Sequence, residues 1–213
     1  MTHSNHRRGD RESLEGDYVI LVRGDLRGRP DKAKKAVKIL ADNDPVGLIK
    51  RRTGAALRYM RNWKEGLELR ELVENPDPPI YIAGVYSRKE DVEGVLRDLA
   101  EADLGFSVVV SGIFDAVFHV CKKVGTGPHT VNMSMETIGR TELMPESRIL
   151  EVTTMCGHSL VSEHLVRHLI DRVRKGRMTA DEAGLELGKQ CVCNFFNPIR
   201  AAKIIEGYVT MQR

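Results

Sequence analysis

Apolar residues along the chain recur in short β-branched runs, and stretches with helical spacing separate these runs. The runs at 18–22, 80–85 and 106–110 predict buried strands. The run at 148–154 predicts a further strand, and the alternating apolar residues of 129–138 predict a half-buried one. Strands that alternate with helices at such short intervals favour parallel pairing through right-handed crossovers. We therefore expect an α/β fold with a mixed, mainly parallel sheet and flanking helices.

The same pattern divides the chain into three parts. Residues 1–16 are polar and rich in arginine, which predicts a flexible basic tail. Residues 17–154 are expected to form the α/β sheet domain. Within it, the looser pattern of 46–73 predicts a helical segment whose basic residues form a solvated face. The helical spacing of apolar residues in 155–213 predicts a C-terminal helical subdomain that packs on the sheet domain and carries a C-x-C turn.

Composition narrows the class of protein. The 213 residues include 41% hydrophobic and 30% charged residues, which is typical of a globular protein. A net charge of +3 does not favour nucleic acid as a partner. The sequence has no apolar run of membrane-spanning length and no pattern typical of a signal peptide. We expect a soluble, cytoplasmic protein without a membrane partner.

Four cysteines carry the clearest chemical signal. Cys121 falls on the apolar face of a predicted helix, so we expect it to be a small buried hydrophobe. Cys156 lies between a predicted strand and a helix, two residues before His158. Cys191 and Cys193 lie between two predicted helices. Because the backbone in such turns can direct side chains at a common point, Cys156, His158, Cys191 and Cys193 are candidate metal ligands.

Soft sulfur ligands favour zinc or an iron–sulfur cluster over magnesium or calcium. Three thiolates and one imidazole form an ordinary zinc site. Three thiolates with an open fourth position can also hold a cluster, for instance of the [4Fe–4S] type. Since the surrounding helices have enough apolar residues to fold without a structural zinc, we favour iron–sulfur, with zinc as the alternative. The expected function is that of a cysteine-ligated metalloprotein acting on or near a small anionic ligand; as an enzyme, it would be a lyase or a desulfurising enzyme.

Three other interpretations of the cysteines stay open. The protein can be a metal-free thiol enzyme, with Cys156 as the nucleophile at a helix start and His158 or His129 as the base. It can be a non-enzymatic accessory protein that binds a protein partner through its basic residues. The cysteines can also be purely structural.

Backbone groups supply the candidate anion site. Ser111 and Gly112 follow a predicted strand and open a helix, whose N–H groups can bind a phosphate or a carboxylate. In a parallel sheet the carboxyl ends of the strands meet at one edge, so we expect Ser111 and Gly112 to lie beside Cys156. His129 follows a glycine-rich turn, where it is a candidate acid–base group or ligand.

Overall fold

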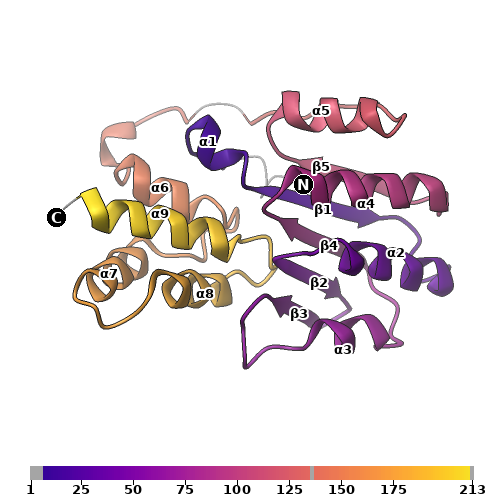
Figure 1. Ribbon diagram of the computed structural model, residues 1–213, viewed down its shortest axis with the longest axis horizontal. Coiled ribbons are helices and arrows are strands. Elements are labelled where there is room, and N and C mark those ends of the chain that lie inside the picture. Colours follow the sequence, from indigo (N-terminus) through magenta and orange to yellow (C-terminus); the bar gives the residue numbers. More distant parts are fainter. Residues whose placement is uncertain (1–6, 135–136, 212–213) are drawn as a thin grey trace.

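The computed structural model describes residues 7–134 and 137–211 and is built around a five-stranded sheet (Figure 1). The strands are β1 (Tyr18–Arg23), β2 (Gly47–Arg51), β3 (Ala56–Met60), β4 (Tyr81–Tyr86) and β5 (Ser107–Ser111). The helices are α1 (Arg11–Leu14), α2 (Pro30–Asp42), α3 (Leu69–Glu74), α4 (Lys89–Ala102), α5 (Phe114–Lys123), α6 (Ser147–Thr153), α7 (Glu163–Arg174), α8 (Ala180–Gln190) and α9 (Pro198–Met211), with a 3-10 turn at Thr141–Leu143.

The sheet interleaves two strand–helix–strand units. The strand order is β3-β2-β4-β1-β5, and every neighbouring pair is antiparallel. Because β1 and β2 are both antiparallel to β4, they run parallel to each other with β4 between them. The strands β4 and β5 likewise run parallel on either side of β1. This is the split βαβ, or ferredoxin-like, arrangement, extended by β3 at one edge.

The predicted mainly parallel sheet is therefore wrong. Strands joined by a helix do run in the same direction, but each such pair is separated by a strand of the other unit. Residues 46–73, predicted to be helical, contain the hairpin of β2 and β3. The first four residues of β2 are all buried, so its apolar residues do not alternate with period two. The basic residues 50–52 consequently lie on β2 and its turn, and not on a helix face.

Two further predicted strands are absent. Residues 148–154, predicted to be a strand, lie almost entirely in α6. The predicted strand 129–138 has no strand pairing among its described residues, and positions 135–136 lie outside them. Val131 and Met133 of this segment are exposed, so their alternation does not mark one buried face.

The two faces of the sheet bury different helices. Alternate residues of β1, such as Tyr18 and Ile20, pack against α2, α4 and α5. The intervening Val19 and Leu21 pack in a second core with residues of α6, α7, α8 and α9. Figure 1 shows these last four helices gathered beside one end of the strands. None of the described helices combines the length and the apolar character needed to cross a bilayer.

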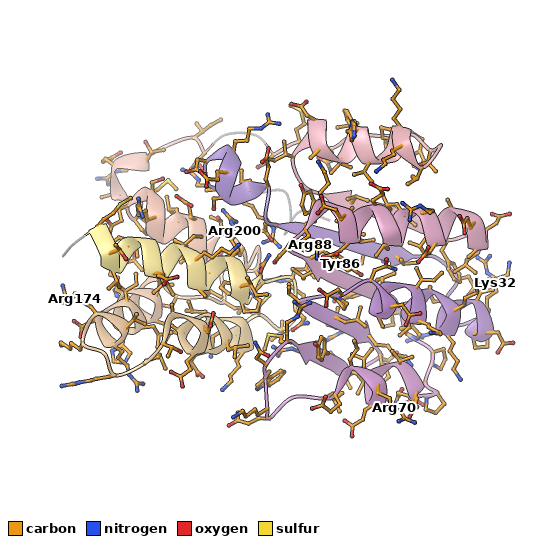
Figure 2. The ribbon with its side chains drawn as sticks, viewed as in Figure 1. Lys32, Arg70, Tyr86, Arg88, Arg174 and Arg200 are labelled. Atoms are coloured by element: carbon orange, nitrogen blue, oxygen red, sulfur yellow. The ribbon has the colours of Figure 1, made fainter. Side chains whose placement is uncertain are left out.

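A buried ionic cluster joins the C-terminal helices to the start of β1. Asp17 accepts hydrogen bonds from Arg7 and Arg200, at 2.9 Å each, and a third from Asn197 at 3.2 Å. Figure 2 places Arg200 at this junction between the helices and the sheet. Residues 7–16, which the sequence assigns to the tail, thus include α1 and the arginine that binds Asp17.

The contact between α8 and α9 depends on a glycine. A Cβ atom at Gly184 would lie 2.3 Å from the carbonyl oxygen of Pro198, which is a backbone atom and cannot rotate away. We expect Gly184→Ala to lower the free energy of unfolding by about 1–3 kcal/mol through overpacking. Thermal unfolding followed by circular dichroism measures this change. Gly127→Ala is the control, because no atom lies within 4 Å of the Cβ position there; equal melting temperatures for the two variants would contradict the prediction.

Candidate functional site

The first cysteine turn follows α6. The N–H of Cys156 donates to the carbonyl of Thr153 at 3.1 Å, which adds a turn beyond the helix end. The N–H of Ser159 then donates to the carbonyl of Cys156 at 3.0 Å, and Ser159 adopts a left-handed φ of 56°. The sulfur of Cys156 is thereby fixed below a short exposed segment, residues 157–160.

The second cysteine turn repeats this geometry. Cys191 caps α8, and its N–H donates to the carbonyl of Gly188 at 3.1 Å. The N–H of Asn194 donates to the carbonyl of Cys191 at 2.9 Å, and Asn194 has the same left-handed φ of 56°. Each turn therefore closes three residues after a cysteine on a residue in the left-handed region.

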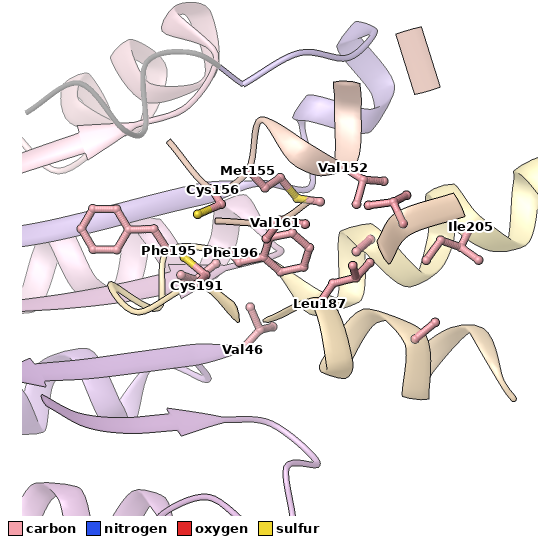
Figure 3. Packing of buried hydrophobic residues seen from close by; sticks show 14 of the residues in the cluster. Val46, Val152, Met155, Cys156, Val161, Leu187, Cys191, Phe195, Phe196 and Ile205 are labelled. Carbon is pink, nitrogen blue, oxygen red and sulfur yellow. The ribbon is translucent and has the colours of Figure 1, made fainter. Parts of the chain in front are cut away.

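The two turns bring three sulfur atoms together. The Sγ atoms of Cys191 and Cys193 lie 3.5 Å apart, and the Cys156 side chain hydrogen-bonds to Cys191. Figure 3 shows the sulfurs of Cys156 and Cys191 between the two turns, beside Phe195. The exposed fractions of Cys156, Cys191 and Cys193 are 2%, 0% and 4%. All three are free thiols. We call these three residues the thiol cluster.

Backbone N–H groups surround the thiol cluster. Cys156 accepts hydrogen bonds from the N–H groups of His158 and Leu160. Cys191 accepts one from Phe196, and Cys193 accepts one from Phe195. Donors of this kind stabilise the thiolate form of a cysteine and tune the sulfur ligands of metal sites.

The thiols of the thiol cluster differ in the direction of their pKa shifts. The hydrogen bond from Cys156 to Cys191, and burial after it, raise the pKa of Cys156 well above that of an ordinary thiol. The hydrogen bond from Cys191 lowers the pKa of Cys193. Cys193 is thus the first of the three to become a thiolate. This direction does not favour Cys156 as a metal-free nucleophile.

Side chains of the sheet complete the surroundings of the thiol cluster. Arg58 of β3 lies within electrostatic reach of Cys191 and Cys193, and it donates to the carbonyl groups of Gly188 and Lys189 at 3.2–3.4 Å. Tyr81 of β4 contacts Phe195 edge to face, with ring centroids 6.4 Å apart. Neither residue was predicted at the site from the sequence, because only the strand register brings them there.

The other predicted site residues are not members of the thiol cluster. Ser111, Gly112 and His129 line a cavity of about 660 Å³ beside β5 and α5, whose lining includes none of the three clustered cysteines. His158 is exposed. Cys121 belongs with the opposite core, as expected for a hydrophobe, and is partly buried.

The rule that placed Ser111 and Gly112 beside Cys156 assumed a parallel sheet, and that assumption is wrong. Because β1 and β5 are antiparallel, Ser111 at the end of β5 pairs with Val19 near the start of β1. The end of β1, at Arg23, pairs with Ser107 at the start of β5. The carboxyl ends of these two strands therefore lie at opposite ends of the sheet, although Arg23 at the end of β1 also lines the cavity that contains Ser111 and Gly112.

The thiol cluster is not a ready-made metal site. Within residues 7–134 and 137–211, no three His, Cys, Asp or Glu side chains are arranged as a set of metal ligands. The sulfurs of the cluster contact one another directly instead of surrounding an open centre.

Comparison with protein-family models, curated proteins and solved structures found no match to this chain.

Proposed function

We propose that this protein is a cysteine-ligated metalloprotein, with Cys156, Cys191 and Cys193 as its three thiolate ligands. A fourth coordination position stays open to a small anionic ligand, which the metal could polarise as a Lewis acid. The observation that carries the proposal is the convergence of three buried sulfurs from two turns of the same geometry, each sulfur with backbone N–H donors.

Charge balance supports a bound cation. Three thiols that hydrogen-bond only to one another and to N–H groups must keep most of their protons, as the raised pKa of Cys156 indicates. A metal ion replaces those protons and allows all three sulfurs to accept the N–H hydrogen bonds as thiolates. Arg58 adds a positive charge near two of the three sulfurs.

Iron–sulfur and zinc are the two centres that such a ligand set can hold. Zinc–sulfur bonds of about 2.3 Å in a tetrahedron place neighbouring sulfurs about 3.8 Å apart. The separation of 3.5 Å between the sulfurs of Cys191 and Cys193 is close to that value. An iron–sulfur cluster holds several iron atoms, so it would require the three side chains to rotate apart. The spacing thus supports zinc. The apolar core around the three cysteines, which does not need a structural zinc in order to fold, favours an iron–sulfur cluster.

The metal content of the protein tests the proposal directly. Protein purified without oxygen is assayed for iron, zinc and acid-labile sulfide per chain, alongside the variants Cys191→Ser and Cys121→Ser. We expect metal in the wild-type protein and in Cys121→Ser, whose cysteine lies in the other core. We expect at least a fivefold loss in Cys191→Ser, because thiolate is replaced by a poor ligand for soft metals.

Each outcome of this assay decides a point. Iron with matching sulfide identifies a cluster, and zinc alone identifies a single ion; both support the proposal. A wild-type protein with neither metal would overturn it, as would a Cys191→Ser protein with the wild-type metal content. Circular dichroism establishes that Cys191→Ser is folded, and Cys193→Ser replaces it if it is not.

A further inference from the structure

One row of residues crosses the sheet beside the thiol cluster. Arg23 of β1 and Arg51 of β2 are both direct Cα partners of Tyr81, which lies between them on β4. Ser107 and Ala56 extend the row to the two edge strands. Directly paired residues point to the same face of a sheet. Because Tyr81 and Ala56 pack against the core that contains the cysteines, the whole row faces the thiol cluster.

The side chains of the two arginines of this row are available to a ligand. Neither the Arg23 nor the Arg51 side chain makes a hydrogen bond or an ion pair with any residue of the described chain. The other arginines of the β2–β3 hairpin differ, since Arg52 pairs with Asp77 and Arg58 binds carbonyl groups and stacks on Trp63. Arg23 is exposed and Arg51 is half-buried, so a ligand from solvent can reach both.

Tyr81 connects this row to the thiol cluster. Its ring contacts Phe195, which follows the C-x-C turn and donates its N–H to Cys193. The phenol lies within electrostatic reach of Cys193 and Cys191 and also of Arg51 and Arg23. A molecule held by the two arginines would therefore lie next to Tyr81, on the side of the sheet that carries the proposed metal.

We propose that Arg23, Tyr81 and Arg51 bind the anionic part of a small oxyanion ligand, a carboxylate or a phosphate, beside the thiol cluster. Strands about 4.8 Å apart place the Cα atoms of Arg23 and Arg51 roughly 10 Å apart. Two long side chains at that separation can converge on one compact dianion above the Tyr81 hydroxyl, where guanidinium groups make paired hydrogen bonds to oxyanions. This inference rests on the proposed function, for which it supplies the ligand class.

Calorimetric titration of the purified protein with malonate and, separately, with inorganic phosphate tests the site. The variants are Arg23→Gln, Arg51→Gln and Tyr81→Phe, and Arg174→Gln is the control because the exposed Arg174 side chain pairs with Asp171 on α7, away from the row. We expect each of the first two variants to weaken binding of the preferred probe at least tenfold, and Tyr81→Phe to weaken it severalfold. Arg174→Gln should bind as the wild type does, and the metal content should be the same in all the variants.

The outcomes separate this inference from the proposed function. Preference for malonate identifies a carboxylate ligand and preference for phosphate a phosphorylated one, and both support the site. If the wild-type protein binds neither probe at millimolar concentration, or if Arg51→Gln binds like the wild type, the anion site is wrong even where the metal is present. If the arginine variants lose binding in a protein that holds no metal, the anion site stands and the metalloprotein proposal fails.

Discussion

Asp17→Asn is expected to lower the free energy of unfolding by about 3–5 kcal/mol, because it leaves two buried arginines without their counter-ion. The exposed fractions of the side chains in the pair of Arg7 and Asp17 are 6% and 0%, and that of Arg200 is 3%. An asparagine keeps the size of the side chain but removes the negative charge that both guanidinium groups face. Urea denaturation followed by circular dichroism measures the loss.

A surface cluster with the same number of charges provides the control. Asp171 on α7 also pairs with two basic residues, Arg174 and Lys175, at 2.7 and 2.6 Å, but both basic side chains are exposed and Asp171 is only half-buried. We expect Asp171→Asn to cost no more than about 1 kcal/mol, since water screens and replaces these contacts. Similar losses for the two variants would show that burial does not determine the strength of the Asp17 cluster.

Asn194→Ala is expected to destabilise the fold by about 2–4 kcal/mol and to loosen the C-x-C turn. The Asn194 amide donates to the carbonyl groups of Tyr59 and Leu48, at 2.8 and 3.2 Å, and its oxygen accepts from Arg58 at 3.4 Å. Alanine leaves those buried carbonyl groups without this donor and adopts the left-handed φ of 56° less readily than asparagine does. Chemical denaturation gives the stability, and the rate of thiol labelling by a maleimide reports the opening of the turn.

Asn194→Gly separates the two contributions. Glycine adopts the left-handed conformation without cost but makes none of the side-chain hydrogen bonds. We expect it to be more stable than Asn194→Ala by about 1 kcal/mol, yet less stable than the wild type. If glycine restores the full stability, the hydrogen bonds to β2 and β3 contribute little, and the turn is held by its backbone alone.

The local parts of the fold follow from sequence patterns. The capping box from Thr179 to Glu182 is a sequence signature of a helix start, and both of its hydrogen bonds are present at the start of α8. The strands predicted at 18–22 and 80–85 are also present, because their runs of β-branched residues are buried. Such signals depend on neighbours within a few residues, so the sequence contains them directly.

These local sequence signals do not determine the order and direction of the strands in the sheet. Two helix-linked strands that run in the same direction are consistent both with a parallel pair and with the split arrangement observed here, and only contacts between distant segments distinguish them. Arg51 illustrates the consequence. Its sequence neighbourhood indicates a solvated basic helix, whereas pairing with Tyr81 places it on a strand beside the cysteines.

The candidate site was predicted in part for the same reason. Cys156, Cys191 and Cys193 stood out through their side-chain chemistry and their positions in turns, and their three sulfurs do meet. Ser111 and Gly112 were assigned to the same place by a rule for parallel sheets, which does not apply to this antiparallel sheet, and they line a cavity beside β5 and α5. The bound metal remains a prediction.

The interleaved strand order also constrains how the chain folds as it is synthesised. The first strand, β1, pairs with β4 and β5, which are synthesised later. Tyr18 can pair only after Tyr86 has been synthesised, and Val19 can pair with β5 only after Ser111 has been synthesised. Until those partners leave the ribosome, an almost wholly apolar strand has both edges unpaired, which is a hazard for aggregation. Contacts of such long sequence separation also slow folding. The nascent chain therefore passes through a stage at which the apolar residues of β1 have no paired strand on either edge.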